Sequence, residues 1–370
     1  MPSELYLGLM SGTSLDAIDA VLLDCRSRPR LVASLSLPLE PELRETLLAL
    51  CQPGDEEIFR MGIADVAMAN ALAHAANCLM QEAGCTPDDI AAIGSHGQTV
   101  RHHPESGFTL QLGDPNLIAE LTNCHVVADF RRRDIAAGGQ GAPLVPAFHA
   151  AMLRQPGEHR CVLNLGGMAN ISWLDADARR PVLGFDTGPA NVLMDGWMQA
   201  QLHQPMDRNG QLAQQGRIIE TFLEQLMQHP YLSLPPPKST GRETFNQAFL
   251  QSTLDSMDGV FSHPDIMRTL LEFTARSIAQ SVLDLGQQGR LIACGGGSYN
   301  PLLMQRLQAL LPCFVVETSS AHGIEPQWME AMAFAWLAWA RLHGQPGNVP
   351  SVTGARGLRC LGGLYSPTTD

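Results

Sequence analysis

Three short stretches of this sequence combine glycine with residues that can bind an anion. Ser-Gly at 11–12 and Gly-Gly at 166–167 each separate two apolar segments, and Gly-Gly-Gly at 295–297 follows a third. Backbone N–H groups in such turns form anion nests, and glycine lets phosphate oxygens approach closely. Asp186 ends another apolar run before Thr-Gly-Pro, where a carboxylate is well placed as a general base. Together these stretches predict a phosphate site with an acid nearby, although Asp186 taken alone is better explained as a cap of its turn.

The elements expected around these turns repeat along the chain. The order strand, glycine turn, strand, strand, helix occurs twice, starting near Leu5 and near Cys161. The two copies share no residue-level identity, so the repeat is one of architecture only. The polar stretch 129–141 is the expected hinge between domains. Helices are expected from their apolar spacing at 41–50, 56–82, 244–255, 266–285 and 327–342.

Composition narrows the class of protein. A chain of 370 residues is longer than one hydrophobic core usually serves, which favours two domains. A content of 45% hydrophobic and 16% charged residues is typical of a globular enzyme with a large buried core. The net charge of −13 argues against a surface that binds nucleic acid. The nine cysteines show no metal-ligand spacing and indicate reduced thiols in a cytoplasm. Neither a signal peptide nor a membrane span is expected.

Other catalytic classes find less support. No G-x-x-x-x-G-K-[ST] loop occurs, and 295–297 do not continue as a dinucleotide fingerprint. A hydrolase would need a nucleophile elbow, which is absent, and neighbouring Ser95 and His96 would point to opposite faces of a strand. His96 is therefore expected to contact substrate or to be structural. His102 and His103 have no companions at ligand spacing and are expected in a solvated loop.

Two charged groups have both a functional and a plain interpretation. The arginines at 131–133 form either a solvated basic surface or a site where one of them binds a substrate carboxylate through two hydrogen bonds. Glu330 begins the last helix, where a carboxylate is favourable whatever its function.

Seven motifs, in this order and over residues 5–365, resemble those of the anhydro-N-acetylmuramic acid kinases. They are GLMSGTSLD at 8–16, SHGQT at 95–99, DFRR at 129–132, AGGQGAPLVP at 137–146, NLGGMANI at 164–171, DTGPAN at 186–191 and EAMAFA at 330–335. The resemblance implies the α/β fold of the actin-like ATPase and hexokinase superfamily: two ribonuclease H-like domains with an interdomain nucleotide cleft. We expect the first domain, with the C-terminal helix, at 1–130 plus about 331–370, and the second, with the catalytic aspartate, at 131–330. In this superfamily the adenosine lies at a turn like 295–297, so the resemblance implies an adenosine site there.

The resemblance also implies an activity. Such kinases take 1,6-anhydro-N-acetylmuramic acid from cell-wall turnover, open its anhydro ring with water and phosphorylate O6 at the expense of Mg-ATP. Asp186 would then be the general base that acts on water. The first turn lacks the superfamily pattern Asp-x-Gly-x-Thr, so the magnesium ligand is open between Asp16 and Asp186. A homodimer is expected, as is usual in the superfamily.

The site residues expected on this basis fall into two groups. The ATP contacts are Ser11, Gly12, Thr13, Ser14, Leu15, Asp16, Ala17, Ile18, Asp19, Asn164, Gly166, Gly167, Gly295, Gly296 and Gly297. The substrate contacts are His96, Gln98, Thr99, Arg131, Arg132 and Glu330. Two alternatives stay open: another sugar or acyl kinase of the superfamily, and an ATP-gated binding protein of the Hsp70 kind.

Overall fold

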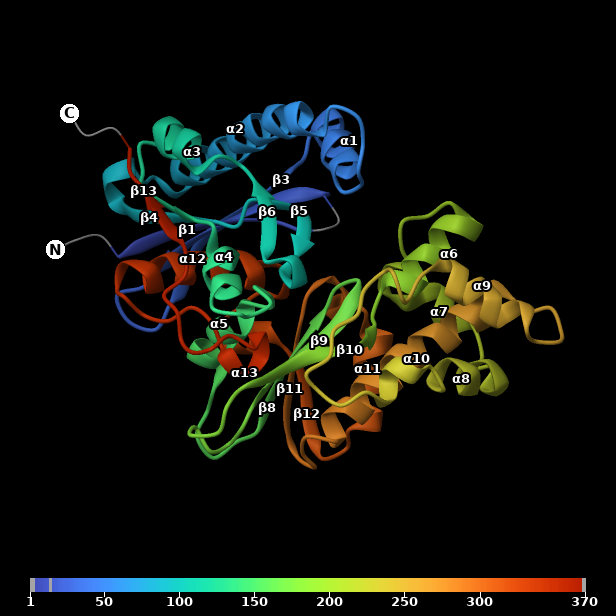
Figure 1. The fold of residues 1–370 in the computed structure, drawn as a ribbon. Coiled ribbons are helices and arrows are strands. Elements are labelled where there is room, and N and C mark those ends of the chain that lie inside the picture. The colour runs from blue at the N-terminus through green and yellow to red at the C-terminus, as the bar shows by residue number, and fades with distance from the viewer. Residues whose placement is uncertain (1–3, 13–14, 368–370) are drawn as a thin grey trace. The chain divides into compact units, whose positions relative to one another are not determined.

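The computed structural model describes residues 4–12 and 15–367, which form two compact units (Figure 1). The first unit consists of residues 1–152 and 328–370, and the second of residues 153–327. Thr13 and Ser14, both expected to contact ATP, lie outside the described residues.

The first unit is built on a mixed sheet of six strands in the order β13-β7-β4-β1-β2-β3. In this sheet β1, β2 and β3 are antiparallel neighbours, whereas β1, β4 and β7 are parallel. The strands are β1 (Leu5–Ser11), β2 (Ala17–Asp24), β3 (Arg30–Pro38), β4 (Ile90–Ser95), β7 (Val126–Ala128) and β13 (Gly363–Tyr365), with β5 (Gln98–His103) and β6 (Phe108–Leu112) as a separate hairpin. The helices are α1 (Pro41–Leu50), α2 (Glu57–Ala83), α3 (Pro115–Thr122), α4 (Phe130–Ala136), α5 (Val145–Leu153), α12 (Met329–Leu342) and α13 (Pro350–Thr353).

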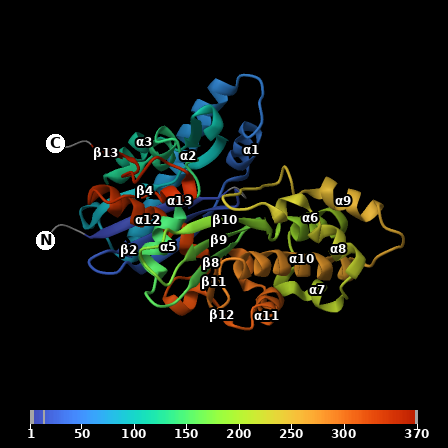
Figure 2. The same cartoon turned by 60° about the horizontal axis from the view of Figure 1, so that its bottom comes forward.

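The second unit has a sheet of five strands in the order β10-β9-β8-β11-β12. Its strands are β8 (Arg160–Leu165), β9 (Met168–Leu174), β10 (Leu183–Pro189), β11 (Gly289–Cys294) and β12 (Phe314–Thr318). Its helices are α6 (Val192–Leu202), α7 (Gln211–Gln215), α8 (Glu220–Met227), α9 (Gln247–Asp255), α10 (His263–Leu283) and α11 (Pro301–Leu310). Figure 2 shows α10 beside α7 and α8, and it also contacts β10 of the sheet.

The predicted repeat is present in both sheets. In each sheet, three antiparallel strands are followed by two strands that are parallel to the first. This gives the order β3-β2-β1-β4-β7 in the first unit, where β13 adds a sixth strand, and the order β10-β9-β8-β11-β12 in the second. The first hairpin of each unit closes at a predicted glycine turn, with Ser11 paired to Ile18 and Leu165 paired to Ala169. This is the strand order of a ribonuclease H-like domain.

Helix α12 packs directly on the first sheet, which fixes where Glu330 lies. A side chain on Gly8 of β1 would overlap the Ala331 carbonyl, and one on Gly94 of β4 would overlap the Phe334 carbonyl. Glycine at both positions therefore lets the helix backbone touch the strands. Among the described residues no helix combines the length and the hydropathy that crossing a bilayer requires.

Two local predictions need correction. The stretch 129–141, expected as the hinge between domains, lies inside the first unit and contains helix α4. The buried Asp134 carboxylate of this helix accepts hydrogen bonds from Gly141 N–H (2.9 Å), Asn348 Nδ2 (2.7 Å) and Thr353 Oγ1 (2.9 Å). These bonds tie α4 to the C-terminal part of the first unit. His102 and His103 end strand β5 instead of lying in a loop, and His102 Nδ1 lies 3.1 Å from Thr109 Oγ1 on β6.

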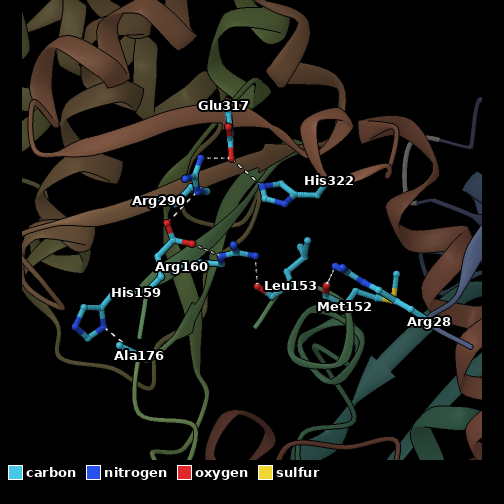
Figure 3. A network of polar contacts seen from close by, with 10 residues as sticks. Arg28, Met152, Leu153, His159, Arg160, Ala176, Arg290, Glu317 and His322 are labelled. Carbon is cyan, nitrogen blue, oxygen red and sulfur yellow. Dashed lines mark hydrogen bonds and ion pairs between the residues drawn. The ribbon is translucent and has the colours of Figure 1, made fainter. Parts of the chain in front are cut away.

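Charged side chains connect neighbouring strands of the second sheet (Figure 3). Arg290 on β11 donates to Glu158 (3.2 Å) and to Glu317 on β12 (2.8 Å), and His322 lies 2.7 Å from Glu317. Arg160 on β8 donates to Glu158 and, at 2.9 Å, to the Leu153 carbonyl. Arg160 therefore links Leu153, the first residue of the second unit, to strand β8 of the sheet.

All nine cysteines carry free thiols. Cys51 in the first unit and Cys313 in the second are exposed. Burial raises the pKa of the Cys25 thiol to about 12 and that of Cys124 to about 11. These two buried thiols are therefore protonated and unreactive near neutral pH.

Candidate active site

Two of the predicted glycine turns meet in the second unit. Strands β8 and β11 are parallel neighbours, with Asn164 beside Cys294, so both strands end at the same edge of the sheet. Gly295 has φ +78°, and a Cβ there would lie 2.5 Å from Asn164 Oδ1. A Cβ on Gly297 would lie 2.8 Å from Leu165 Cβ, whereas one on Gly296 would have no protein atom within 4 Å. The third turn thus packs on the second and leaves Gly296 open.

Helix α6 holds the Gly166–Gly167 turn in a fixed orientation. The Gly166 carbonyl accepts from Asn191 N–H (3.1 Å) and from Asn191 Nδ2 (2.9 Å), and the Gly167 carbonyl accepts from the amides of Ala190 and Val192. In a trans peptide the carbonyl and the N–H point in opposite directions. The Gly167 amide, which shares a peptide unit with the Gly166 carbonyl, therefore points away from α6 at the exposed tip of the hairpin, as an anion-binding turn requires.

Asp186 lies in the same unit, on β10 beside Asn170 of β9. Its Oδ2 accepts hydrogen bonds from Thr240 N–H at 3.0 Å and from Ser239 Oγ at 3.2 Å. Burial raises the pKa of Asp186 above its ordinary value, the Thr240 and Ser239 donors lower it, and the negative charge of Glu243 adds to the rise. The result is a partly buried carboxylate that holds a proton more readily than an exposed aspartate, which suits a general base.

The contacts around Asp186 include residues that the sequence did not single out as site residues. The segment 238–240 lies 52 or more positions from Asp186 along the chain, and its polar composition after a proline run indicated only that 238–242 could line the second domain's side of the cleft. Tyr231 donates its hydroxyl to the Asp186 carbonyl at 2.7 Å. Neither contact follows from a local pattern, because both depend on the tertiary path of the chain.

In the first unit, some side chains in and after the turn that follows β1 are buried and others are exposed. Ser11 is 1% exposed, and its hydroxyl has no partner among the described residues. The side chains of Leu15 and Ile18 belong to the hydrophobic core of this unit, so only their backbone is available to a nucleotide. Asp16 is exposed, and Asp19 accepts from Ser36 Oγ at 2.7 Å.

Three of the expected substrate contacts cluster in the first unit: His96, Arg131 and Glu330. Arg131 donates to His96 Nε2 (2.8 Å) and to the Gly141 carbonyl (2.9 Å). Burial and the Arg131 charge lower the pKa of His96 to about 3, and burial lowers the pKa of Arg131 to about 10. Burial raises the pKa of Glu330, whereas Arg131 lowers it and Asp19 raises it further.

This arrangement determines the tautomer of His96. A guanidinium has no acceptor, so the Nε2 atom that it contacts carries a lone pair, and the proton of the neutral ring resides on Nδ1. Within the described chain Nδ1 has no partner at full hydrogen-bond geometry although His96 is only 6% exposed, and the backbone of Gly97 and Ser11 beside the ring partly offsets the lowering of its pKa. A buried N–H is thus available to an acceptor atom of a ligand.

A cavity of about 190 Å³ lies beside this ring. Its lining includes Ser95, His96, Asp114, Asp129 and Arg132. The Ser95 hydroxyl, 1% exposed, also finds no partner in the described part of the chain. The exposed Arg132 has a loose contact of 3.4 Å with Asp129. The cavity therefore offers two unused donors and a guanidinium.

Two further residues expected to contact the substrate, Gln98 and Thr99, lie close to His96 in the sequence. Gln98 is 2% exposed and donates to the Thr99 carbonyl at 3.2 Å, while its Oε1 has no partner among the described residues. Thr99 Oγ1 accepts from Gln111 at 3.1 Å. No group of three or more histidine, cysteine or acidic side chains in residues 4–12 and 15–367 is arranged to hold a metal ion.

The sheet order and the glycine turns define the class of this protein as an α/β protein of the actin-like ATPase fold. A family model described as anhydro-N-acetylmuramic acid kinase matches residues 4–367. The chain belongs to this family. It is 50% identical over 368 residues to the anhydro-N-acetylmuramic acid kinase of Shewanella amazonensis, covering 99% of each chain. It is also 50% identical over 369 residues to that of Shewanella oneidensis, covering 99% of this chain and 100% of the relative.

Among solved structures, the chain is similar to the activator of the 2-hydroxyisocaproyl-CoA dehydratase from Clostridium difficile with bound ADPNP. The identity is 13% and the TM-score 0.47, over 92% of this chain and 96% of that one. A likeness at this level says nothing about activity. Family membership confirms the predicted family, fold class and enzyme class, a kinase of anhydro-N-acetylmuramic acid.

Proposed function

We propose that this kinase opens the 1,6-anhydro bridge of anhydro-N-acetylmuramic acid with water and transfers the γ-phosphoryl group of ATP to O6, within peptidoglycan recycling. The observation that carries the proposal is Asp186, a partly buried carboxylate in the unit where the glycine turns at 166–167 and 295–297 pack together. The turns at 166–167 and 295–297 would bind ATP in the second unit, and the contacts expected of residues 11–19 remain a prediction from the sequence.

Each bond that forms in this reaction is matched by a bond that breaks. Asp186 accepts a proton from water as the water oxygen bonds to C1. The C1–O6 bond breaks, and O6 forms a bond to the γ-phosphorus while the bond from that phosphorus to ADP breaks. The products are N-acetylmuramic acid 6-phosphate and ADP. Base assistance typically contributes about 10²–10⁴-fold to the rate, and positioning by the turn amides adds to it.

Magnesium would arrive with ATP, and the donor set is compatible with that. Mg²⁺ in nucleotide sites needs only one or two carboxylates besides phosphate oxygens and water. Of the two carboxylates considered from the sequence, Asp16 is exposed and is the better candidate, because Asp186 is held by Thr240 and Ser239 and is assigned as the base. When bound, the ion would supply charge neutralisation on the phosphate chain.

The sugar would occupy the first unit near His96. We assign the Nδ1–H of His96 and the Ser95 hydroxyl as donors to sugar acceptor atoms, because both are buried and lack partners within the described residues. Arg132 lines the cavity and is exposed, whereas Arg131 is engaged by His96 and Gly141. Arg132 therefore suits the lactyl carboxylate better, and Arg131 positions the imidazole.

The test uses Mg-ATP and the anhydro sugar in ¹⁸O-labelled water. We expect label at C1 of a 6-phosphorylated product, because the water oxygen becomes the anomeric hydroxyl. A 6-phosphorylated sugar without label at C1 would refute the hydrolytic half of the reaction. ADP release that does not depend on the sugar would instead favour an ATPase of the Hsp70 kind, and phosphorylation of other sugars alone would favour a different sugar kinase.

Location and assembly complete the proposal. The free thiols of all nine cysteines support a reducing compartment, which we propose is the cytoplasm. A homodimer remains a prediction, for which sedimentation equilibrium is the measurement.

A further inference from the structure

The donors that hold Asp186 act on only one of its two oxygens. Thr240 N–H and Ser239 Oγ both bind Oδ2, at 3.0 and 3.2 Å. No donor in the described part of the chain reaches Oδ1. The carboxylate is thus asymmetric: Oδ2 has two partners, and Oδ1 has its lone pairs available.

The segment that carries these donors is itself fastened to the strand of Asp186. Asp186 N–H donates to the Lys238 carbonyl at 3.2 Å. The Lys238 ammonium donates to the Leu232 carbonyl at 2.9 Å and lies 5.0 Å from the centre of the Tyr231 ring. Tyr231 closes the loop by donating to the Asp186 carbonyl at 2.7 Å. Main chain and side chain of Asp186 are therefore held by one continuous segment, 231–240.

We propose that Ser239 and the Thr240 amide are positioning groups for the base: they hold Oδ2 and so make Oδ1 the oxygen that takes the proton from water. This inference rests on the proposed role of Asp186. It adds that the segment 238–240 keeps the carboxylate ionised and oriented despite its burial. Ser239 is not a catalytic residue, because it acts through Asp186.

The expected effect of removing the Ser239 hydroxyl has a definite sign. The groups that face Asp186 are the Ser239 and Thr240 donors, the Glu243 carboxylate and the Tyr231 phenol, with the Lys238 carbonyl at its main chain. Ser239→Ala removes one donor that lowers the pKa of Asp186, so this pKa rises and the base is protonated over a wider range. The acidic limb of the kcat/KM profile should move upward by about one pH unit, as loss of one hydrogen bond to a charged, water-accessible group implies.

Two further variants make the test specific. Ser239→Thr keeps a hydroxyl at the same position and should restore the limb to the wild-type pH. Tyr231→Phe deletes a hydroxyl bound to the Asp186 main chain rather than to its carboxylate, so its acidic limb should stay in place. Thermal unfolding of each variant shows whether it is folded.

The outcomes distinguish the positioning role of Ser239 from the role of Asp186 as the base. An unshifted limb in folded Ser239→Ala, or a Ser239→Thr variant shifted as far as the alanine variant, would overturn the positioning role while leaving Asp186 as the base. An equal shift in Tyr231→Phe would overturn it as well, because the effect would then not depend on Oδ2. If Asp186→Asn instead keeps wild-type kcat, the proposed base itself is wrong.

Discussion

Gly296 and Gly297 are neighbours in one turn, yet the structure predicts opposite consequences when a side chain is added. A Cβ on Gly297 would lie 2.8 Å from Leu165 Cβ and 3.0 Å from Asn191 Nδ2, both in the packed contact between the two turns. Overpacking of this kind costs about 1–3 kcal/mol. At about 2–4 °C per kcal/mol for a domain of this size, Gly297→Ala should lower Tm by roughly 2 to 12 °C.

Gly296→Val should leave the fold intact and impair nucleotide binding. No protein atom lies within 4 Å of a Cβ at Gly296, so the change in stability should stay within about 0.5 kcal/mol. If adenosine passes over this turn, the valine side chain occupies its space, and KM for ATP should rise about tenfold or more, which corresponds to about 1.4 kcal/mol.

Calorimetric unfolding without nucleotide and a coupled ADP assay over a range of ATP concentrations measure both effects. A Gly296→Val variant with unchanged KM for ATP would show that adenosine does not lie at this turn. A loss of Tm in Gly296→Val as large as in Gly297→Ala would refute the packing argument.

Further predictions concern the base and the sugar. Asp186→Asn should bind ATP and sugar normally but turn over at least about 10²-fold more slowly, measured as kcat in the coupled assay; near-normal kcat would remove Asp186 from its role. Arg132→Ala should raise KM for the muramic sugar about tenfold or more without changing KM for ATP, as loss of a bidentate carboxylate contact implies. Arg131→Ala frees the Nε2 atom of His96, so the ring should gain a proton more readily and its NMR-detected pKa should rise from about 3. An unchanged KM in Arg132→Ala would place the carboxylate elsewhere.

The parts of the fold that the sequence predicted correctly depend on local periodicity and on repetition. The order strand, glycine turn, strand, strand, helix was expected twice, and both units contain it. The sequence did not reveal that β8 and β11 are parallel neighbours, which brings the turns at 166–167 and 295–297 together. Helix α2 ends at Ala83, one residue beyond the predicted 82, because Gly84 after it adopts φ +67°.

The parts that were missed depend on contacts between distant segments. Helix α4 was not predicted, because it lies in a polar, glycine-rich stretch. Its Asp134 carboxylate accepts hydrogen bonds from Asn348 and Thr353, which lie more than 200 positions later in the chain. The donors to Asp186 come from an irregular segment without periodicity. A run of arginines likewise does not reveal that Arg131 turns inward to His96 while Arg132 remains exposed.

The two exposed thiols give this protein a spectroscopic use. Cys51 belongs to the first unit and Cys313 to the second, and both are open to maleimide reagents, whereas Cys25, Cys124, Cys161 and Cys294 are buried. A donor dye and an acceptor dye attached at these natural positions would convert any change in the separation of the units on addition of ATP into a change in energy transfer. Replacing the partly exposed Cys78, Cys85 and Cys360 with serine would confine the dyes to that pair.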